Sequence, residues 1–134
     1  MPSQSMITHP DDGDHPDGLN WLTLDEAGKN AYICGFIEGL FLGHCFTTWG
    51  LPGERQDDPT YINATRSFND HWDRFVANAT YRQFLEGLDR FYAEERNSKI
   101  EIQHGMWLVM NEITGMSKTK LETMIDAWRQ KDGK

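Results

Sequence analysis

The spacing Glu101-x-x-His104 is the pattern in this sequence that comes closest to a metal-binding motif. Di-iron carboxylate bundles need two Glu-x-x-His motifs and two further glutamates, which face one another from separate helices. The part of this chain that is expected to fold contains one such motif, and a single copy arises often by chance. We therefore predict no metal site and no bound cofactor.

A histidine beside a cysteine, at His44 and Cys45, raises the question of an activated thiol nucleophile. Neighbouring residues on a helix point about 100° apart, so these two side chains do not face each other. A base would have to come from His71 or His104 through the fold. The chain has no G-x-S-x-G elbow, phosphate-binding loop, zinc-ligand spacing or dinucleotide fingerprint. We therefore predict no catalytic residues and a protein that is not an enzyme.

Glu38 lies in the middle of the most apolar run of the chain, Ala31–Phe46. An unpaired carboxylate is costly to bury. Either Glu38 marks a hydrated stripe on an apolar helix, or it pairs with an arginine and helps to line a pocket. The candidate arginines are Arg74, Arg82 and Arg90. Whether Glu38 converges on one site with His71 and His104 stays open.

The connection Phe46–Gly53, with the sequence FTTWGLPG, is the candidate recognition element. Glycine and proline mark it as a loop, and exposed aromatic side chains are enriched at binding hot spots. We predict that Thr48, Trp49 and Leu51 bind a partner, together with Glu38. The alternative is that Trp49 folds back and covers the core.

One helix has to position most of these residues. The run Ala31–Phe46 is apolar nearly all round, which is typical of a buried helix, and Thr23 with Glu26 forms a capping-box pattern ahead of it. Its glycines recur at four-residue spacing, at Gly35, Gly39 and Gly43. Each interior glycine costs about 1 kcal/mol relative to alanine, so three in a row predict close contact with another backbone. We expect a helix of the same chain there, although the same helix of a second copy would also fit.

Four later segments repeat apolar residues at helical spacing. Their proposed N-caps are Thr65, Thr80, Ser98 and Ser117. Asn97 is expected in the left-handed conformation that ends a helix, and Gly115 is expected to end the next one. The sequence thus predicts an all-α fold: a compact bundle of about five helices around the central glycine-rich apolar helix.

The charge of the chain is strongly acidic, with a net value of −8 over 134 residues. That length is typical of one domain. Residues 1–20 contain four aspartates and neither lysine nor arginine, so we predict a disordered acidic tail at 1–20 and a single helical domain at 21–134. The acidic balance argues against direct binding of nucleic acid. It suits a basic protein partner, or solubility alone.

No secretory signal precedes the domain, and the apolar run is too short for a membrane span of about 20 residues. The sequence as written therefore predicts a soluble cytoplasmic protein, or a periplasmic one if an export signal has been removed. Cys34 and Cys45 would lie about 16 Å apart on one helix, which is too far for a disulfide. We expect two reduced thiols and leave an intermolecular bond open.

The phrase Cys34-Gly35-Phe36-Ile37-Glu38-Gly39, with the Phe91–Tyr92 pair and Asn97, resembles a group of small bacterial helical proteins. These proteins carry Cys-x-Gly-Tyr-Ile-x-Gly on an early helix. The group includes immunity proteins that neutralise peptidoglycan amidases delivered by type VI secretion. The resemblance implies a non-enzymatic helical inhibitor, often dimeric, whose ligand is a protein. Those immunity proteins are exported and usually disulfide-bonded, whereas this chain shows no signal and no C-terminal cysteine, and no inhibitory residue carries over.

Taken together, these patterns favour a small, soluble, non-enzymatic protein-binding protein, such as an inhibitor or an adaptor. Its partner is a protein of unknown identity, and both a monomer and a homodimer stay open. One alternative is a helical metal- or small-ligand-binding protein that uses Glu38, Glu101, His71 and His104. Another is an acidic decoy that occupies the basic surface of a nucleic-acid-binding protein.

Overall fold

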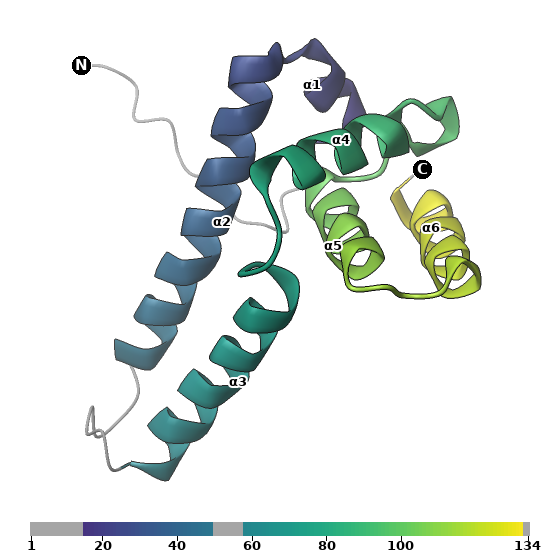
Figure 1. Cartoon of the computed structure of the whole chain (residues 1–134). Coiled ribbons are helices and arrows are strands. Elements are labelled where there is room, and N and C mark those ends of the chain that lie inside the picture. Colours follow the sequence, from purple (N-terminus) through teal and green to yellow (C-terminus); the bar gives the residue numbers. More distant parts are fainter. Residues whose placement is uncertain (1–14, 50–57, 133–134) are drawn as a thin grey trace.

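The computed structural model describes residues 15–49 and 58–132 (Figure 1). These residues form six α-helices, one 3-10 turn and no strand, which confirms the predicted all-α class. The elements are α1 (Gly18–Thr23), α2 (Glu26–Trp49), α3 (Pro59–Phe75), α4 (Tyr81–Tyr92), η1 (Glu95–Asn97), α5 (Ile102–Ile113) and α6 (Lys118–Asp132).

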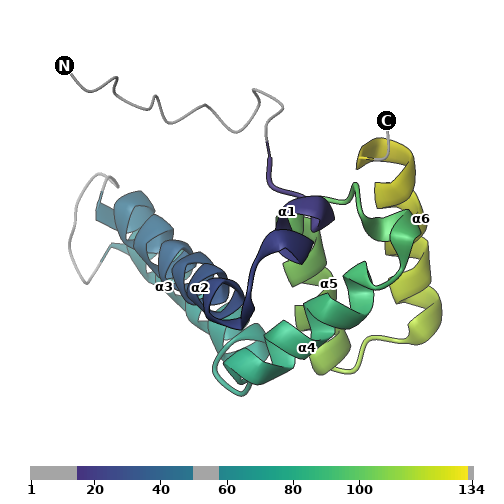
Figure 2. The same ribbon diagram turned by 90° about the horizontal axis from the view of Figure 1, so that it is seen from above.

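The helices are arranged as an arm and a body. Helices α2 and α3 run antiparallel beside each other and form the arm, which projects away from the other helices (Figures 1 and 2). Helices α1, α4, α5 and α6 form the body. Within the arm, His44 stacks on Phe68 with ring centroids 4.0 Å apart, and Phe41 contacts Phe68 and Trp72.

The hydrophobic core lies in the body, where α4 crosses α5. Its fully buried side chains come mainly from α1, α4, α5 and the start of α2: Trp21, Ile33, Phe84, Leu88, Tyr92, Ile100, Ile102, Met106 and Val109. Two glycines allow the close crossing. A Cβ at Gly87 would lie 2.7 Å from Val109 Cγ1, and one at Gly105 would lie 2.9 Å from the Tyr92 hydroxyl oxygen.

The glycine seam of α2 does not make the close contact that its spacing predicts. A Cβ added at Gly35, Gly39 or Gly43 would meet no described atom within 4 Å. The reason is the orientation of the helix, because Ile33 and Ile37 are the residues that α2 buries and the glycines lie on another side of the turn. The predicted crossing with a helix of the same chain is therefore wrong for the described residues.

Local hydrogen bonds explain why α2 starts two residues later than a Thr23 cap would allow. Asp17 caps a separate helix, α1, and Thr23 ends that helix by donating to the carbonyl of Asn20 at 2.7 Å. Asp25 then starts α2 by accepting from the Gly28 N–H at 2.7 Å. The Thr23 capping box is therefore wrong, because the side chain of Asp25 supplies the cap and the helix begins after it.

Among the four other predicted N-caps and the predicted helix end at Gly115, three are confirmed and two are wrong. Thr80 forms its capping box with Gln83 as predicted, Ser117 accepts from the Lys120 N–H, and Gly115 has a φ of +88°. Thr65 does not cap a helix, because Asp58 starts α3 earlier. Ser98 does not cap α5 either. That helix begins at Ile102, directly after Glu101, and no side chain caps its N-terminus.

Asn97 is buried and does not adopt the left-handed conformation. Its amide nitrogen donates to the carbonyl of Phe91 at 2.8 Å, and its carbonyl oxygen accepts from Arg129 Nε at 2.9 Å. Asn97 thus joins the end of α4 to α6 through its side chain.

The folded part reaches into the segment predicted as a tail. Helix α1 begins at Gly18, and the carbonyl of Pro16 accepts from the Ile102 N–H at 2.8 Å. Residues 1–14 lie outside the described part of the chain. Among the described helices, none is long and apolar enough to cross a membrane.

Candidate functional site

The predicted recognition loop falls mostly outside the described residues. Helix α2 continues to Trp49, well past the end expected near His44. The side chains of Thr48 and Trp49 and the whole of Leu51 are not described. Their role in partner binding therefore stays a prediction.

Glu38 is exposed on α2, and its Oε1 accepts from the Cys34 thiol over 3.7 Å. The arginines proposed as its partners are engaged elsewhere: Arg82 with Glu26 and Glu86, Arg90 with Glu112, and Arg74 over the ring of Phe75. The interpretation of Glu38 as part of a hydrated stripe is the one that fits. Cys34 and Cys45 are not joined by a disulfide.

The Glu-x-x-His motif is divided between two sets of contacts. His104 Nδ1 bonds to Asp132 Oδ2 at 2.7 Å, and its ring stacks on Trp128. Glu101 instead accepts from Gln103 Nε2 at 2.6 Å. Within residues 15–49 and 58–132, no three His, Cys, Asp or Glu side chains come together as metal ligands.

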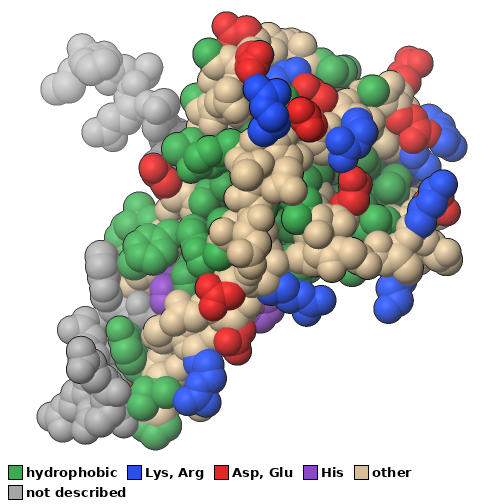
Figure 3. Space-filling view, in the orientation of Figure 1, with side chains coloured by type: hydrophobic (Ala, Val, Ile, Leu, Met, Phe, Trp, Pro, Cys, Tyr) green, Lys and Arg blue, Asp and Glu red, His purple; other side chains and the backbone are tan. Residues whose placement is uncertain are grey.

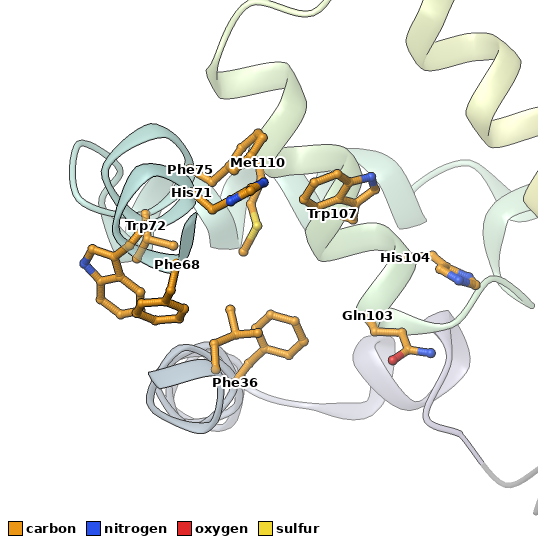
Figure 4. Close-up of a pocket in the computed structure, with 11 residues that line it drawn as sticks. Phe36, Phe68, His71, Trp72, Phe75, Gln103, His104, Trp107 and Met110 are labelled. Atoms are coloured by element: carbon orange, nitrogen blue, oxygen red, sulfur yellow. The ribbon is translucent and has the colours of Figure 1, made fainter. Parts of the chain in front are cut away.

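A cleft of about 510 Å³ lies between the arm and α5 and is hereafter the arm–body cleft (Figure 4). Helix α2 contributes one wall, α3 and its C-terminus a second, and α5 a third. The lining residues are Phe36, Leu40, Phe68, His71, Trp72, Phe75, Val76, Gln103, His104, Trp107 and Met110. His71 and His104 thus share a cleft, and Glu38 does not line it.

Helical spacing places the lining side chains on one face of each helix. The residues of α3 recur at i, i+3, i+4 and i+7, which are neighbours on a helix surface. The ring centroids of Phe75 and Trp107 are 5.0 Å apart, so α3 and α5 are in contact within the lining of the cleft. Figure 4 shows Phe36 across the open space from Trp107. Sequence periodicity identifies the apolar face of α3 but not the cleft, because α5 covers only part of that face.

A second candidate surface is the side of α2 that faces away from α3 and is hereafter the outer face of α2. Its residues are Ala31, Gly35, Glu38, Gly39, Leu42, Gly43 and Phe46. Leu42 is 47% exposed and Phe46 is 63% exposed. Hydrophobic side chains gather over α2 in the space-filling view (Figure 3). Glu38 is the only charged residue of this face, and helix geometry places it at the edge of the face, where it can stay in contact with water.

Helix α3 presents a different outer face, although it belongs to the same arm. Apart from Pro59 at its first position, its exposed residues are polar: Thr60, Asn63, Arg66, Ser67, Asn69, Asp70, Asp73 and Arg74, with His71 at the margin where this face meets the cleft. Such a face is typical of a helix in contact with water. The apolar outer face of α2 is therefore not a general property of the arm.

Comparison of the chain with protein-family models, with curated proteins and with solved structures found no match. A function is therefore inferred from the two candidate surfaces, the arm–body cleft and the outer face of α2.

Proposed function

We propose that this protein is a non-enzymatic protein-binding domain and that the outer face of α2 is its binding surface. The observation that carries the proposal is the contrast between the two outer faces of the arm. Helix α3 exposes polar residues, whereas α2 exposes Leu42 beside three glycines, with one carboxylate. An exposed leucine beside a row of glycines on a projecting helix offers apolar surface and open space to a partner.

The partner that this face fits best is the same face of a second copy. A charged partner would find only Glu38 to pair with. The face itself combines a row without side chains, at Gly35, Gly39 and Gly43, with a large side chain at Leu42. A surface that carries both features suits the isologous contact of a two-fold dimer.

An antiparallel pair of α2 helices shows how the two features would meet. With the two-fold axis at Gly39 and a rise of about 1.5 Å per residue, Leu42 of each copy lies at a height between Gly35 and Gly39 of the other. The absent side chains would leave room for the leucine. Two arms paired in this way form a four-helix arrangement, a common architecture for helical proteins.

The side chains that could act in catalysis support a non-enzymatic role by their placement. A nucleophile needs a base within hydrogen-bonding reach. Glu38 Oε1 lies 3.7 Å from the Cys34 sulfur, beyond the usual reach of about 2.6–3.2 Å for an activating base. The thiol also accepts from the Tyr81 hydroxyl at 3.7 Å, and this hydrogen bond raises the pKa of Tyr81. His104 contacts Asp132, and His71 contacts a carbonyl of its own helix.

The resemblance to immunity proteins extends the proposal to an inhibitory role. In that role the dimer is the assembly that binds a protein ligand. The predicted contacts Thr48, Trp49 and Leu51 follow directly after the outer face of α2 along the chain.

The test is the association state of the purified protein, measured by sedimentation velocity over a wide range of concentrations. We expect a dimer that Leu42→Glu converts to a monomer. Asn69→Glu is the matched control, because it adds the same charge to the polar outer face of α3 and is expected to leave the dimer intact. A wild-type protein that stays monomeric at every concentration would contradict pairing through α2.

Gly39→Leu provides a second variant that separates association from folding. Nothing described lies within 4 Å of a Cβ at this position, and leucine favours a helix more than glycine does, so the monomer is expected to keep its helix content and to melt no lower than the wild-type monomer. The larger side chain is expected to abolish the dimer, because it fills the seam that the partner would occupy. A dimer as tight as the wild type would show that the seam is not the contact.

A further inference from the structure

We infer that the arm–body cleft binds a small, uncharged aromatic molecule that carries a hydroxyl or ring N–H group. The inference is independent of pairing through α2. It concerns a different part of α2: Phe36 and Leu40 line the cleft, whereas the outer face is formed by other residues.

The size and composition of the cleft define the body of the ligand. Its volume of about 510 Å³ lies within the range of about 300–1,000 Å³ that is usual for small-molecule sites. Five aromatic rings line it, from Phe36, Phe68, Trp72, Phe75 and Trp107. Aromatic rings favour offset or edge-on contact with another ring, and the Met110 sulfur adds a polarizable neighbour.

The absence of charge among the lining side chains defines the charge of the ligand. The lining contains no Asp, Glu, Lys or Arg, although the chain carries a net charge of −8. A charged ligand would lose its hydration without gaining an ion pair. The ligand that fits is therefore neutral.

The contacts of the polar lining residues define its functional group. His104 is bonded to Asp132, and Gln103 donates to Glu101, which does not line the cleft. His71 Nδ1 lies 2.6 Å from the carbonyl oxygen of Ser67. A carbonyl oxygen only accepts, so Nδ1 carries the hydrogen, and Nε2 of the neutral ring presents a lone pair. A ligand hydroxyl or N–H can donate to that lone pair.

The cleft is also lined by apolar surface that a ligand would cover. Trp107 on α5 is 43% exposed and Leu40 on α2 is 39% exposed, and both line the same space. Figure 4 shows His71 extending from α3 toward Trp107. An aromatic ligand in this space would contact Trp107 and reach His71 at the same time.

The test compares 2-naphthol with naphthalene, which share a two-ring body and differ by one hydroxyl group. Binding is followed at about pH 8, where imidazole side chains are mostly neutral, through the indole N–H signals in ¹⁵N-resolved NMR spectra. We expect both probes to saturate and to shift the signals of Trp72 and Trp107 but not that of Trp21, which donates to Asp89 in the core. One hydrogen bond should make 2-naphthol bind roughly three- to tenfold more tightly.

Variants locate the site and the hydrogen bond. His71→Phe is expected to keep naphthalene binding and to remove the advantage of 2-naphthol. Trp107→Ala and Leu40→Ala, on two different helices, are expected to weaken both probes at least threefold. Leu19→Ala is the matched control, because Leu19 is an exposed leucine on α1 outside the cleft. Circular-dichroism melting curves confirm that each variant is folded.

Several results would overturn the inference. They are the absence of saturable binding, binding that Trp107→Ala and Leu40→Ala leave unchanged, and a 2-naphthol advantage that persists in His71→Phe. Shifts of the Trp72 and Trp107 signals with protein concentration alone would mean that a second copy occupies the cleft. Repeating the titration with Leu42→Glu distinguishes the two proposals, because that variant should bind both probes like the wild type even if α2 pairing fails.

Discussion

Gly87 of α4 lies directly against Val109 of α5, since a Cβ on the glycine would be 2.7 Å from Val109 Cγ1. This contact allows the two helices that carry most of the core to approach closely. Gly39 of α2 differs, because no described atom lies within 4 Å of the position that a Cβ on this glycine would take. Two helical glycines of one chain therefore have different structural roles.

Alanine substitution is expected to change the free energy of unfolding in opposite directions at these two positions. Gly87→Ala should lower it by about 1–3 kcal/mol, because the new methyl group overpacks against Val109. Gly39→Ala should raise it by about 0.5–1 kcal/mol, because alanine favours the helix and meets nothing. Urea titrations at low protein concentration measure both values. A loss of stability in Gly39→Ala would show that the seam is packed within the monomer.

Tyr92 is expected to make the fold sensitive to alkaline pH. Burial raises its pKa well above the ordinary value of 10.0, and its hydroxyl donates to the carbonyl of Ile100 at 2.9 Å. Above about pH 10 the Tyr92 hydroxyl therefore keeps its proton in the folded state, whereas it loses this proton in the unfolded chain. The contribution of Tyr92 to stability is complete below about pH 10 and declines above it by about 1.4 kcal/mol per pH unit.

Tyr92→Phe checks this expectation. The variant should lose about 1–2 kcal/mol near neutral pH, because the Ile100 carbonyl loses its donor. Between about pH 10 and about pH 11 it should lose less stability than the wild type. Part of the decline should persist, since burial also raises the pKa of Tyr32. Equal slopes for the two proteins in urea titrations would contradict the role assigned to Tyr92.

Asn97 provides a comparison between the two interpretations of one residue. If it were a left-handed helix end, Asn97→Gly would be neutral or stabilising. The structure predicts instead that Asn97→Ala lowers the free energy of unfolding by about 2–3 kcal/mol, because the side chain joins Phe91 to Arg129. Asn97→Gly should lower it by about 0.5–1 kcal/mol more. A glycine variant as stable as the wild type would favour the left-handed interpretation.

Elements that depend on near neighbours could be predicted from the sequence. The all-α class, the apolar faces of α4 and α5, the Thr80–Gln83 capping box and the turn at Gly115 follow from residues within one or two helical turns of each other. Predictions failed where two local signals competed. Thr23 and Asp25 both match a cap for the start of α2, and the hydrogen bond to Gly28 comes from Asp25.

The candidate surfaces depended on contacts between distant segments. Phe68, Trp72 and Phe75 show the same helical spacing whether they are buried or line an open cleft, and the position of Trp107 on α5 decides between these states. Glu38 could be assigned to a hydrated stripe or to an ion pair until the partners of the arginines were known.

The Glu101-x-x-His104 motif shows the same division between sequence and structure. Spacing along the chain places the two residues near the start of one helix, because that relation depends only on helix geometry. Tertiary structure decides the partner of His104, because Asp132 comes from the end of α6, whereas the Glu101 side chain accepts from its near neighbour Gln103. By itself the sequence determined that the chain is helical and which residues share a helix face. The packing of the arm against the body decided which of those faces are buried and which histidines share a cleft. The sequence could not show this, because contacts between separate helices leave no periodic signal in the chain.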